Sequence, residues 1–295
     1  MYELIKVTDK CYYIDCPSKI GIIFTGDDTA VAIDSGLDKD VAKRVLRRLD
    51  EAGKHLTDVF VTHSHADHIG GNALLQERTG CRILAPEIEC DFVNHPILEP
   101  QFLFGANPTK DLLGKFFFAE KSSAEVLSES VLPDGVKAVS LPGHCFNMVG
   151  FVTDDGVFYI ADCLSSKATL EKYGVGYIYD IKSYLETLEA IKHIDCKYYV
   201  PSHAEVTEDI SDLADFNAQT VLTIGGAIVE ILARPLTFDD LLSEVFTKFN
   251  ITMNFQQYAL VGSTVKSYLT WLQDLEKIKY SVCDGKILWE RNSAL

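Results

Sequence analysis

One segment, DVFVTHSHADHIGGN from Asp58 to Asn72, constrains the fold of this chain more than any other. It joins an apolar, β-branched run to side chains that can bind metal ions, and two glycines follow directly. The candidate ligands are His63, His65, Asp67 and His68. A buried strand that ends in a turn would present them at one edge of a sheet, where glycine lets the backbone crowd a metal ion. Imidazole nitrogen and carboxylate oxygen are donors that borderline divalent ions prefer, whereas a histidine-rich surface loop needs neither strand nor glycines. The segment therefore predicts a metal site.

Further candidate site residues lie at or near the ends of other short, strand-like segments. Asp34 lies in TAVAIDSG, His144 in LPGH, Asp162 at the end of VFYIAD and His203 in YYVPSH. Taken alone, Asp162 would be more typical of a turn at the end of a strand, and His203 of the protein surface. Together with the spacing H-x-H-x-D-H, however, they resemble the signature of the metallo-β-lactamase superfamily, whose elements occur here in the same order. The resemblance covers roughly the first 205 residues, which read as alternating strand and helix units.

The resemblance implies an α/β fold, an αββα sandwich, with two adjacent metal positions. The implied ligands of the first are His63, His65 and His144, and those of the second are Asp67, His68 and His203. Asp162 matches the carboxylate that bridges both. The implied cofactors are two divalent metal ions, with zinc as the default and iron or manganese as alternatives.

The resemblance also implies the chemistry. Two bridged ions would lower the pKa of a shared water and supply hydroxide near neutral pH. Asp67 would both bind a metal ion and orient this nucleophile. Asp34 falls outside the ligand set, and we expect it to orient a histidine or a backbone donor beside the metals.

The remaining histidines, His55, His95 and His193, match nothing in the family pattern and are expected on the surface or at helix ends. Cys145 and Cys163 each follow a predicted ligand. Neighbours along a strand point to opposite faces, so burial explains these cysteines as well as an approach to the metals does.

Composition narrows the setting of the protein. The chain has 295 residues, 47% of them hydrophobic, which allows one large domain or a domain with a small module. A formal charge of −16 disfavours nonspecific binding to nucleic acid. The amino-terminal residues lack the apolar core of a signal peptide, and no run is long enough for a membrane span. Eight cysteines without a C-x-x-C pair favour free thiols, so we expect a cytoplasmic protein. The expected partner is a small-molecule substrate.

The pattern along the chain predicts two parts. Residues 1–209 are expected to form the catalytic domain, and residues 210–295 a mainly helical module. Thr237 with Asp240 is typical of a capping box, a second helix is expected over residues 265–277, and Asp284 with Gly285 indicates a hairpin. Helices followed by a hairpin resemble a winged helix, although a helical appendage that covers the catalytic domain explains them equally well.

An aromatic segment at residues 94–121 does not fit the strand and helix pattern. It combines three prolines with five phenylalanines: Phe102, Phe104, Phe116, Phe117 and Phe118. We expect irregular structure that forms part of a lid over the site. Packing into a core or a contact in a homodimer are the alternatives.

These features predict a dinuclear hydrolase that cleaves an ester-like bond, preferably a thioester or another carboxylic ester. The motif is most similar to that of glyoxalase II, but residues 210–295 offer no basic glutathione site, and PGHCFNMVG lacks a second histidine of many relatives. A phosphodiesterase or nuclease that uses the carboxy-terminal module is the alternative. Its predicted last helix has few cations, so nucleic acid is not the expected partner. A metal-binding scaffold without turnover is the third possibility.

Overall fold

A computed structural model describes residues 1–292. Its largest sheet follows chain order, from β1 to β7. The strands are β1 (Leu4–Lys6), β2 (Cys11–Ile14), β3 (Ile20–Phe24), β4 (Thr29–Ile33), β5 (His55–Phe60), β6 (Arg82–Ala85) and β7 (Ala124–Val126). The first four pair antiparallel, and β4 to β7 pair parallel. Parallel neighbours need crossover connections, which bring their carboxyl ends to one edge of the sheet.

The second sheet has the order β11-β10-β9-β8. Its strands are β8 (Val136–Ser140), β9 (Val149–Thr153), β10 (Val157–Ser165) and β11 (Tyr198–His203). A hairpin turn at residues 154–156 joins β9 to β10, with Gly156 at a φ of 82°. Strand β11 is parallel to β10, so His203 also arrives at a carboxyl end.

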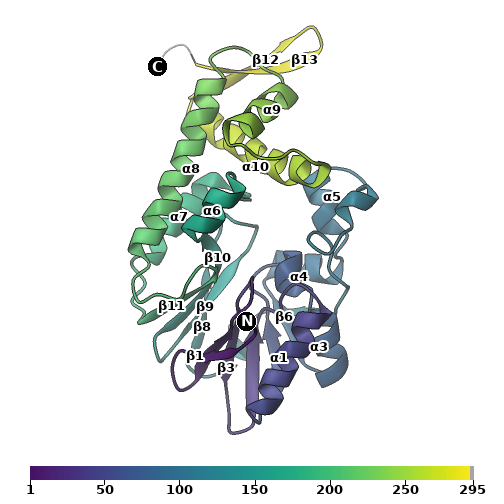
Figure 1. Ribbon diagram of the computed structural model, residues 1–295, viewed down its shortest axis with the longest axis vertical. Coiled ribbons are helices and arrows are strands. Elements are labelled where there is room, and N and C mark those ends of the chain that lie inside the picture. The colour runs from purple at the N-terminus through teal and green to yellow at the C-terminus, as the bar shows by residue number, and fades with distance from the viewer. Residues whose placement is uncertain (293–295) are drawn as a thin grey trace.

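Helices cover the outer faces of the two sheets, and a third apolar layer lies between the sheets (Figure 1). In β4, Ala30 and Ala32 pack towards helix α1 (Lys39–Glu51), whereas Val31 and Ile33 face the second sheet. Helix α1 presents one apolar face and is capped by Asp38. The alternation along β4 is what a strand buried on two different sides requires. The predicted αββα sandwich is confirmed.

The remaining elements before residue 209 are short except for α7. They are α2 (Ala66–Ile69), α3 (Asn72–Thr79), α4 (Glu87–Asn94), α5 (Leu98–Phe104), η1 (Lys110–Leu112), η2 (Glu129–Val131), α6 (Lys167–Tyr173) and α7 (Ile181–Ile191). The expectation of irregular structure at residues 94–121 was wrong for α5. Pro100 lies in the first turn of this helix, where a missing backbone donor costs little.

The carboxy-terminal part consists of α8 (Ser211–Ile231), α9 (Phe238–Lys248), α10 (Phe255–Asp274), β12 (Ile278–Cys283) and β13 (Lys286–Arg291). Thr237 caps α9 as predicted, because its hydroxyl accepts from the amide of Asp240. Helix α10 begins ten residues before the expected position, since Asn254 caps it and accepts from the Gln257 amide. The hairpin β12–β13 is paired as the sequence predicts.

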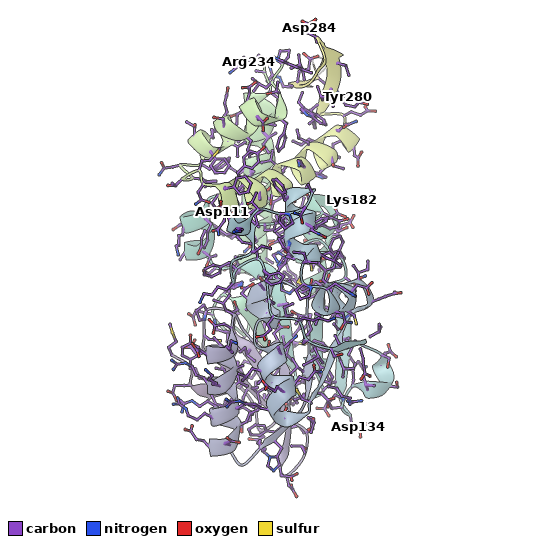
Figure 2. All side chains as sticks on the ribbon, turned by 90° about the vertical axis from the view of Figure 1, so that its right-hand side faces the viewer. Asp111, Asp134, Lys182, Arg234, Tyr280 and Asp284 are labelled. Carbon is purple, nitrogen blue, oxygen red and sulfur yellow. The ribbon has the colours of Figure 1, made fainter. Side chains whose placement is uncertain are left out.

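These last helices do not have a core of their own. Their buried side chains join those of β10 and α7 in one continuous cluster, which also reaches β12. In Figure 1, α10 also lies beside α5, and the rings of Phe104 and Phe255 are 5.7 Å apart. Figure 2 places Tyr280 and Asp284 at one end of the long axis and Asp134 near the other. The boundary at residue 209 and the winged-helix resemblance remain predictions. In the part of the chain described, no helix has the length and apolar character of a membrane span.

Candidate metal centre

The predicted cluster forms where β5 ends. Strand β5 stops at Phe60, and the chain then passes through His63 and His65 into helix α2, which carries Asp67 and His68. The two glycines that follow allow close packing. A Cβ on Gly70 would lie 1.9 Å from the carbonyl oxygen of Leu37, and one on Gly71 would lie 2.4 Å from that of Ser35. The glycines thus bring α2 against the β4–α1 loop, rather than against the metal site as the sequence suggested.

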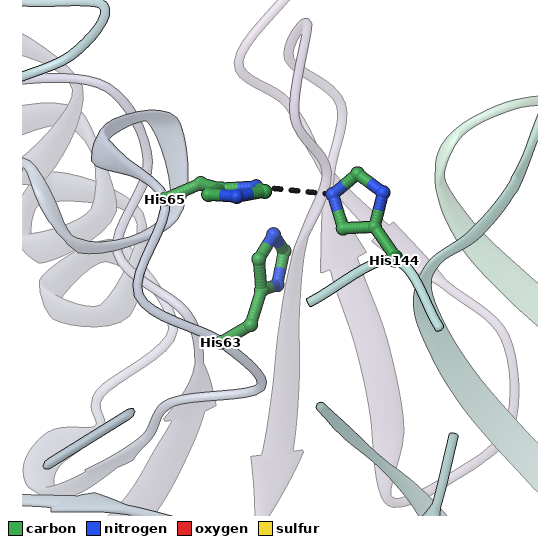
Figure 3. A group of neighbouring side chains, drawn as sticks. All are labelled: His63, His65 and His144. Carbon is green, nitrogen blue, oxygen red and sulfur yellow. Dashed lines mark hydrogen bonds between the residues drawn. The ribbon is translucent and has the colours of Figure 1, made fainter. Parts of the chain in front are cut away.

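Three histidines make the first group (Figure 3). Ligand atoms of His63, His65 and His144 all lie within 4.8 Å of one another. His144 comes from the loop after β8, and its Nε2 lies 3.0 Å from Nδ1 of His65. His63 is completely buried, and the rings of His63 and His144 meet edge to face. Three imidazoles from two distant segments therefore point into one small volume.

Asp67, His68 and His203 make the second group, again within 4.8 Å of one another. The Oδ2 atom of Asp67 lies 3.4 Å from Nε2 of His203 and 3.7 Å from Nε2 of His68. The same oxygen accepts a hydrogen bond of 2.6 Å from the hydroxyl of Ser18. This group therefore combines a carboxylate with two imidazoles.

Asp162 lies between the two groups. Its carboxylate oxygens are within 4.0 Å of four ring nitrogens, namely Nε2 of His63 (4.0 Å), His68 (3.2 Å), His144 (3.7 Å) and His203 (3.0 Å). The strand that carries it is irregular here, because Ala161 has a φ of 49° and the register with β11 shifts on both sides of that residue. Such a bulge can redirect a side chain, and here it accompanies the carboxylate that faces both groups.

The buried atoms of this cluster fit bound metal ions. Nε2 of His63, Nε2 of His68 and Oδ1 of Asp162 are buried without a hydrogen-bond partner. A polar atom that is buried and unpaired is costly. Neutral imidazole and carboxylate are also the donor set of zinc and similar divalent ions. A divalent ion would satisfy these unpaired ligand atoms, which converge from several elements.

The ring nitrogens that face away from the cluster are held by other groups. Asp34 Oδ2 lies 2.8 Å from Nδ1 of His68. The same carboxylate accepts from the amide and the hydroxyl of Thr62, and that hydroxyl lies 2.9 Å from Nδ1 of His63. Asp34 has a positive φ of 64°, so a sparsely populated backbone conformation places it here. Backbone carbonyls of Tyr177 and Pro17 lie near Nδ1 of His144 and of His203.

The pKa values of the histidines separate the two groups. Burial lowers the pKa of His65 to about 4 and that of His144 to about 3. Burial also opposes the charging of His203, but Asp162 and Asp67 outweigh it and raise its pKa to about 10. The same balance, with Asp34 added, raises the pKa of His68 well above its usual range. The first group is therefore neutral at pH 7, and the second holds protons.

The other histidines lie outside the cluster, as expected. His55 is exposed at the start of β5, His95 ends α4, and His193 pairs with Glu189 on α7. Cys145 and Cys163 are buried, and neither belongs to the candidate metal groups of residues 1–292.

Sequence reasoning missed Ser18, Glu89, Glu99 and Tyr177. Glu89 is fully buried and accepts from the amide and hydroxyl of Ser64 and from the amide of Asn147. It thereby fixes the turn between His63 and His65. The ring of Tyr177 lies 5.1 Å from that of His65. No spacing rule could have identified these residues, since each comes from a different segment.

A cleft of about 690 Å³ opens beside the second group. Asp67 and His203 lie in its wall, together with Phe116 from the aromatic segment and the cations Arg44 and Lys172. The other phenylalanines of that segment differ: Phe104 packs against Phe255, and Phe102 packs against Phe146 and Tyr179. The role of the aromatic segment as a lid therefore remains a prediction, and Phe116 is the phenylalanine of that segment that lines the cleft.

Comparisons with known proteins show the family of this chain. Residues 13–203 match the model of the Metallo-beta-lactamase superfamily. The chain belongs to that superfamily. Among curated relatives, a hydroxyacylglutathione hydrolase from Nitrobacter hamburgensis is 30% identical over 140 residues, which is 47% of this chain and 46% of the relative. Another hydroxyacylglutathione hydrolase, from Rhodopseudomonas palustris, is 44% identical over 149 residues, which is 49% of this chain and 47% of the relative. The chain thus spans less than half the length of these relatives.

Solved structures extend the similarity of fold. A metallo-beta-lactamase family protein from Thermus thermophilus has a TM-score of 0.71 at 15% identity, over 99% of this chain and 97% of that one. A beta-lactamase domain protein from Burkholderia ambifaria has a TM-score of 0.70 at 16% identity, over 98% of this chain and 93% of that one. The carboxy-terminal helices are included in both matches.

Proposed function

We propose that this protein is a dinuclear metal-dependent hydrolase that cleaves a thioester or another carboxylic ester. The observation that carries the proposal is the position of Asp162, whose carboxylate lies within 4.0 Å of Nε2 of His63 and His144 from the first group and of Nε2 of His68 and His203 from the second. A carboxylate between two clusters of ligands is what two neighbouring metal ions require.

His63, His65 and His144 would hold one ion, and Asp67, His68 and His203 the other, with Asp162 between them. When bound, divalent ions such as zinc would lower the pKa of a water molecule and polarise the ester carbonyl. Asp67 would position the attacking water, because Ser18 and His203 fix its Oδ2 at the edge of the cleft. Asp34 would keep His68 in the tautomer with a bare Nε2 by accepting from its Nδ1.

The choice of substrate is supported by the relatives and by the cleft. The matched relatives are named hydroxyacylglutathione hydrolases, and their substrates are thioesters. Phe116 adds an apolar wall beside Asp67. Among residues 1–292, Arg44 and Lys172 have no carboxylate within 4.0 Å; they lie over the rings of Tyr2 and Tyr173 and line the cleft, where they would meet a negative group of a substrate. Eight free cysteines support a reducing, cytoplasmic setting.

The test is a metal analysis combined with a substrate panel. We expect about two metal ions per chain, and thioester hydrolysis that a chelator abolishes and zinc restores. The panel contains S-acylglutathione thioesters, lactones, β-lactams and a bis-aryl phosphodiester. Faster cleavage of the phosphodiester, with salt-sensitive binding of an oligonucleotide, would replace this proposal with the nuclease alternative. Metal-free protein from a metal-replete culture would remove the dinuclear site.

A further inference from the structure

The aromatic segment supplies one buried acid whose only close neighbour in the metal cluster is His65. Glu99 lies in the first turn of α5, and its side chain is 12% exposed. Its Oε1 atom lies 3.6 Å from Nε2 of His65. Within residues 1–292, this imidazole is the only basic group inside 4.0 Å of the Glu99 carboxylate. A carboxylate in such a place is costly unless something compensates it.

His65 differs from the other four histidines in how it faces the cluster. His63, His68, His144 and His203 all turn Nε2 towards Asp162. His65 instead turns Nδ1 inward, 3.0 Å from Nε2 of His144. Its Nε2 therefore faces outward, on the side where Glu99 lies.

Metal ligation fixes where the proton of His65 must be. A nitrogen that binds a metal ion carries no proton, so a neutral ring with Nδ1 inward must be protonated at Nε2. That N–H needs an acceptor in a buried site. For the other histidines the outward Nδ1 meets Thr62, Asp34 or a backbone carbonyl. For His65, within residues 1–292, the acid within 4.0 Å of the outward Nε2 is Glu99.

We propose that Glu99 is a positioning residue that accepts from Nε2 of His65 and so holds its Nδ1 towards the first metal position. The inference rests on the proposed metal site and deepens it. It also gives the aromatic segment a second role, because α5 would complete the site from outside the β5–α2 loop. Glu89 cannot substitute, since Ser64 and Asn147 already occupy both of its oxygens.

The experiment compares zinc affinity in the metal-free protein and in three variants. Competition with a chromophoric chelator gives the affinity for each ion. Glu99→Ala should weaken the first ion about 10- to 100-fold, the usual effect of losing a partner of a ligand histidine. Glu99→Gln should recover most of this affinity, because its amide oxygen still accepts a hydrogen bond. Glu87→Ala, an exposed glutamate on the neighbouring helix α4, should match the wild type.

Two further measurements separate positioning from a structural role. Glu99→Ala removes a buried acid with a single basic neighbour, so the metal-free variant should melt at the wild-type temperature or above it. In zinc-loaded protein, His65 should be the one ligand histidine with a protonated Nε2 in ¹⁵N-histidine NMR. Its N–H should exchange faster with water in Glu99→Ala than in Glu99→Gln.

The outcomes are distinct. Wild-type zinc affinity and an unchanged N–H signal in Glu99→Ala would overturn the role of Glu99 and leave the proposed function standing. Loss of thermal stability in the metal-free Glu99→Ala protein, with no rescue by Glu99→Gln, would assign the residue to folding. A wild-type protein that binds no zinc would overturn both proposals.

Discussion

The two halves of the candidate metal centre contrast in charge, although they share one edge of the fold and both lie beside Asp162. His63, His65 and His144 are buried imidazoles whose pKa values are all lowered, to about 4 for His65 and about 3 for His144. In the other half, aspartates surround two imidazoles, and the pKa of His203 rises to about 10. The first half is an uncharged pocket of nitrogens, whereas the second is a compact network of opposite charges.

The contrast shows that one strand-end loop can prepare two kinds of binding position. Neutral nitrogens in the first half are ready to bind a cation, and no proton has to leave. In the second half, protons on His68 and His203 balance Asp67 and Asp162, so a cation must displace them. Affinity in the two halves should therefore respond differently to substitution and to pH.

The largest expected effect comes from removing a ligand in either half. His144→Ala should lose the first ion and Asp67→Ala the second, so that each variant binds about one ion per chain instead of two. The rate of ester hydrolysis should fall further in both variants than in a variant that removes only a partner of a ligand, for which the loss is about 10- to 100-fold. Elemental analysis and initial rates measure the two effects.

Histidines outside the cluster are the matched controls. His55→Ala and His193→Ala should keep the metal content and turnover of the wild type, since both side chains are exposed and far from the candidate groups. Full turnover in Asp67→Ala would show that the attack on the ester does not depend on this side chain.

The next largest effect should come from pH. Between pH 7 and pH 6, binding at the second half should release up to two protons, so its apparent affinity should fall by up to about 100-fold. The first half should not change over this range, because the pKa values of His65 and His144 lie near 4 and 3. Calorimetric titration in buffers of different ionisation enthalpy counts the protons. Equal proton release in both steps would break the comparison.

Asp34 should affect mainly the second half, because it contacts His68 directly and reaches His63 only through Thr62. Asp34→Ala removes the partner of Nδ1 of His68 and should weaken the second ion about 10- to 100-fold. It also leaves the buried amide of Thr62 without its acceptor, so the metal-free protein should melt at a lower temperature. Asp34→Asn is the control, because its side chain can still accept from that amide.

The smallest effect should come from the hydroxyl that touches both halves. Thr62 Oγ1 lies 2.8 Å from Asp34 Oδ2 and 2.9 Å from Nδ1 of His63. Thr62→Val should weaken the first ion about tenfold, because His63 loses the partner of its Nδ1, and the second ion by less, because Asp34 still holds His68. A change confined to one ion in the chelator competition would show that the two halves are not coupled through this hydroxyl.

The sequence could predict the parts of this centre that follow strand ends. Asp34, His144 and His203 follow the carboxyl ends of β4, β8 and β11, which meet at the cluster, and the order of these residues along the chain was enough to find them. Glu99 could not be predicted, because its place depends on how α5 packs against the rest of the molecule. The start of α10 was missed because Gly262, Ser263 and Thr264, which are typical of a loop, directly precede the expected start, whereas the helix runs through them from its cap at Asn254.

Asn217 links the metal centre to the carboxy-terminal helices in a way that has a dynamic consequence. From α8 its amide bonds both the backbone amide and the carbonyl of Ser165, three residues after Asp162 on β10. Local opening of α8 must break these bonds, so it also loosens the strand that carries Asp162. Whatever binds at Asp162 favours the closed state of both. The amides in the middle of α8 should therefore exchange with deuterium more slowly once the centre is filled, although none of them touches it.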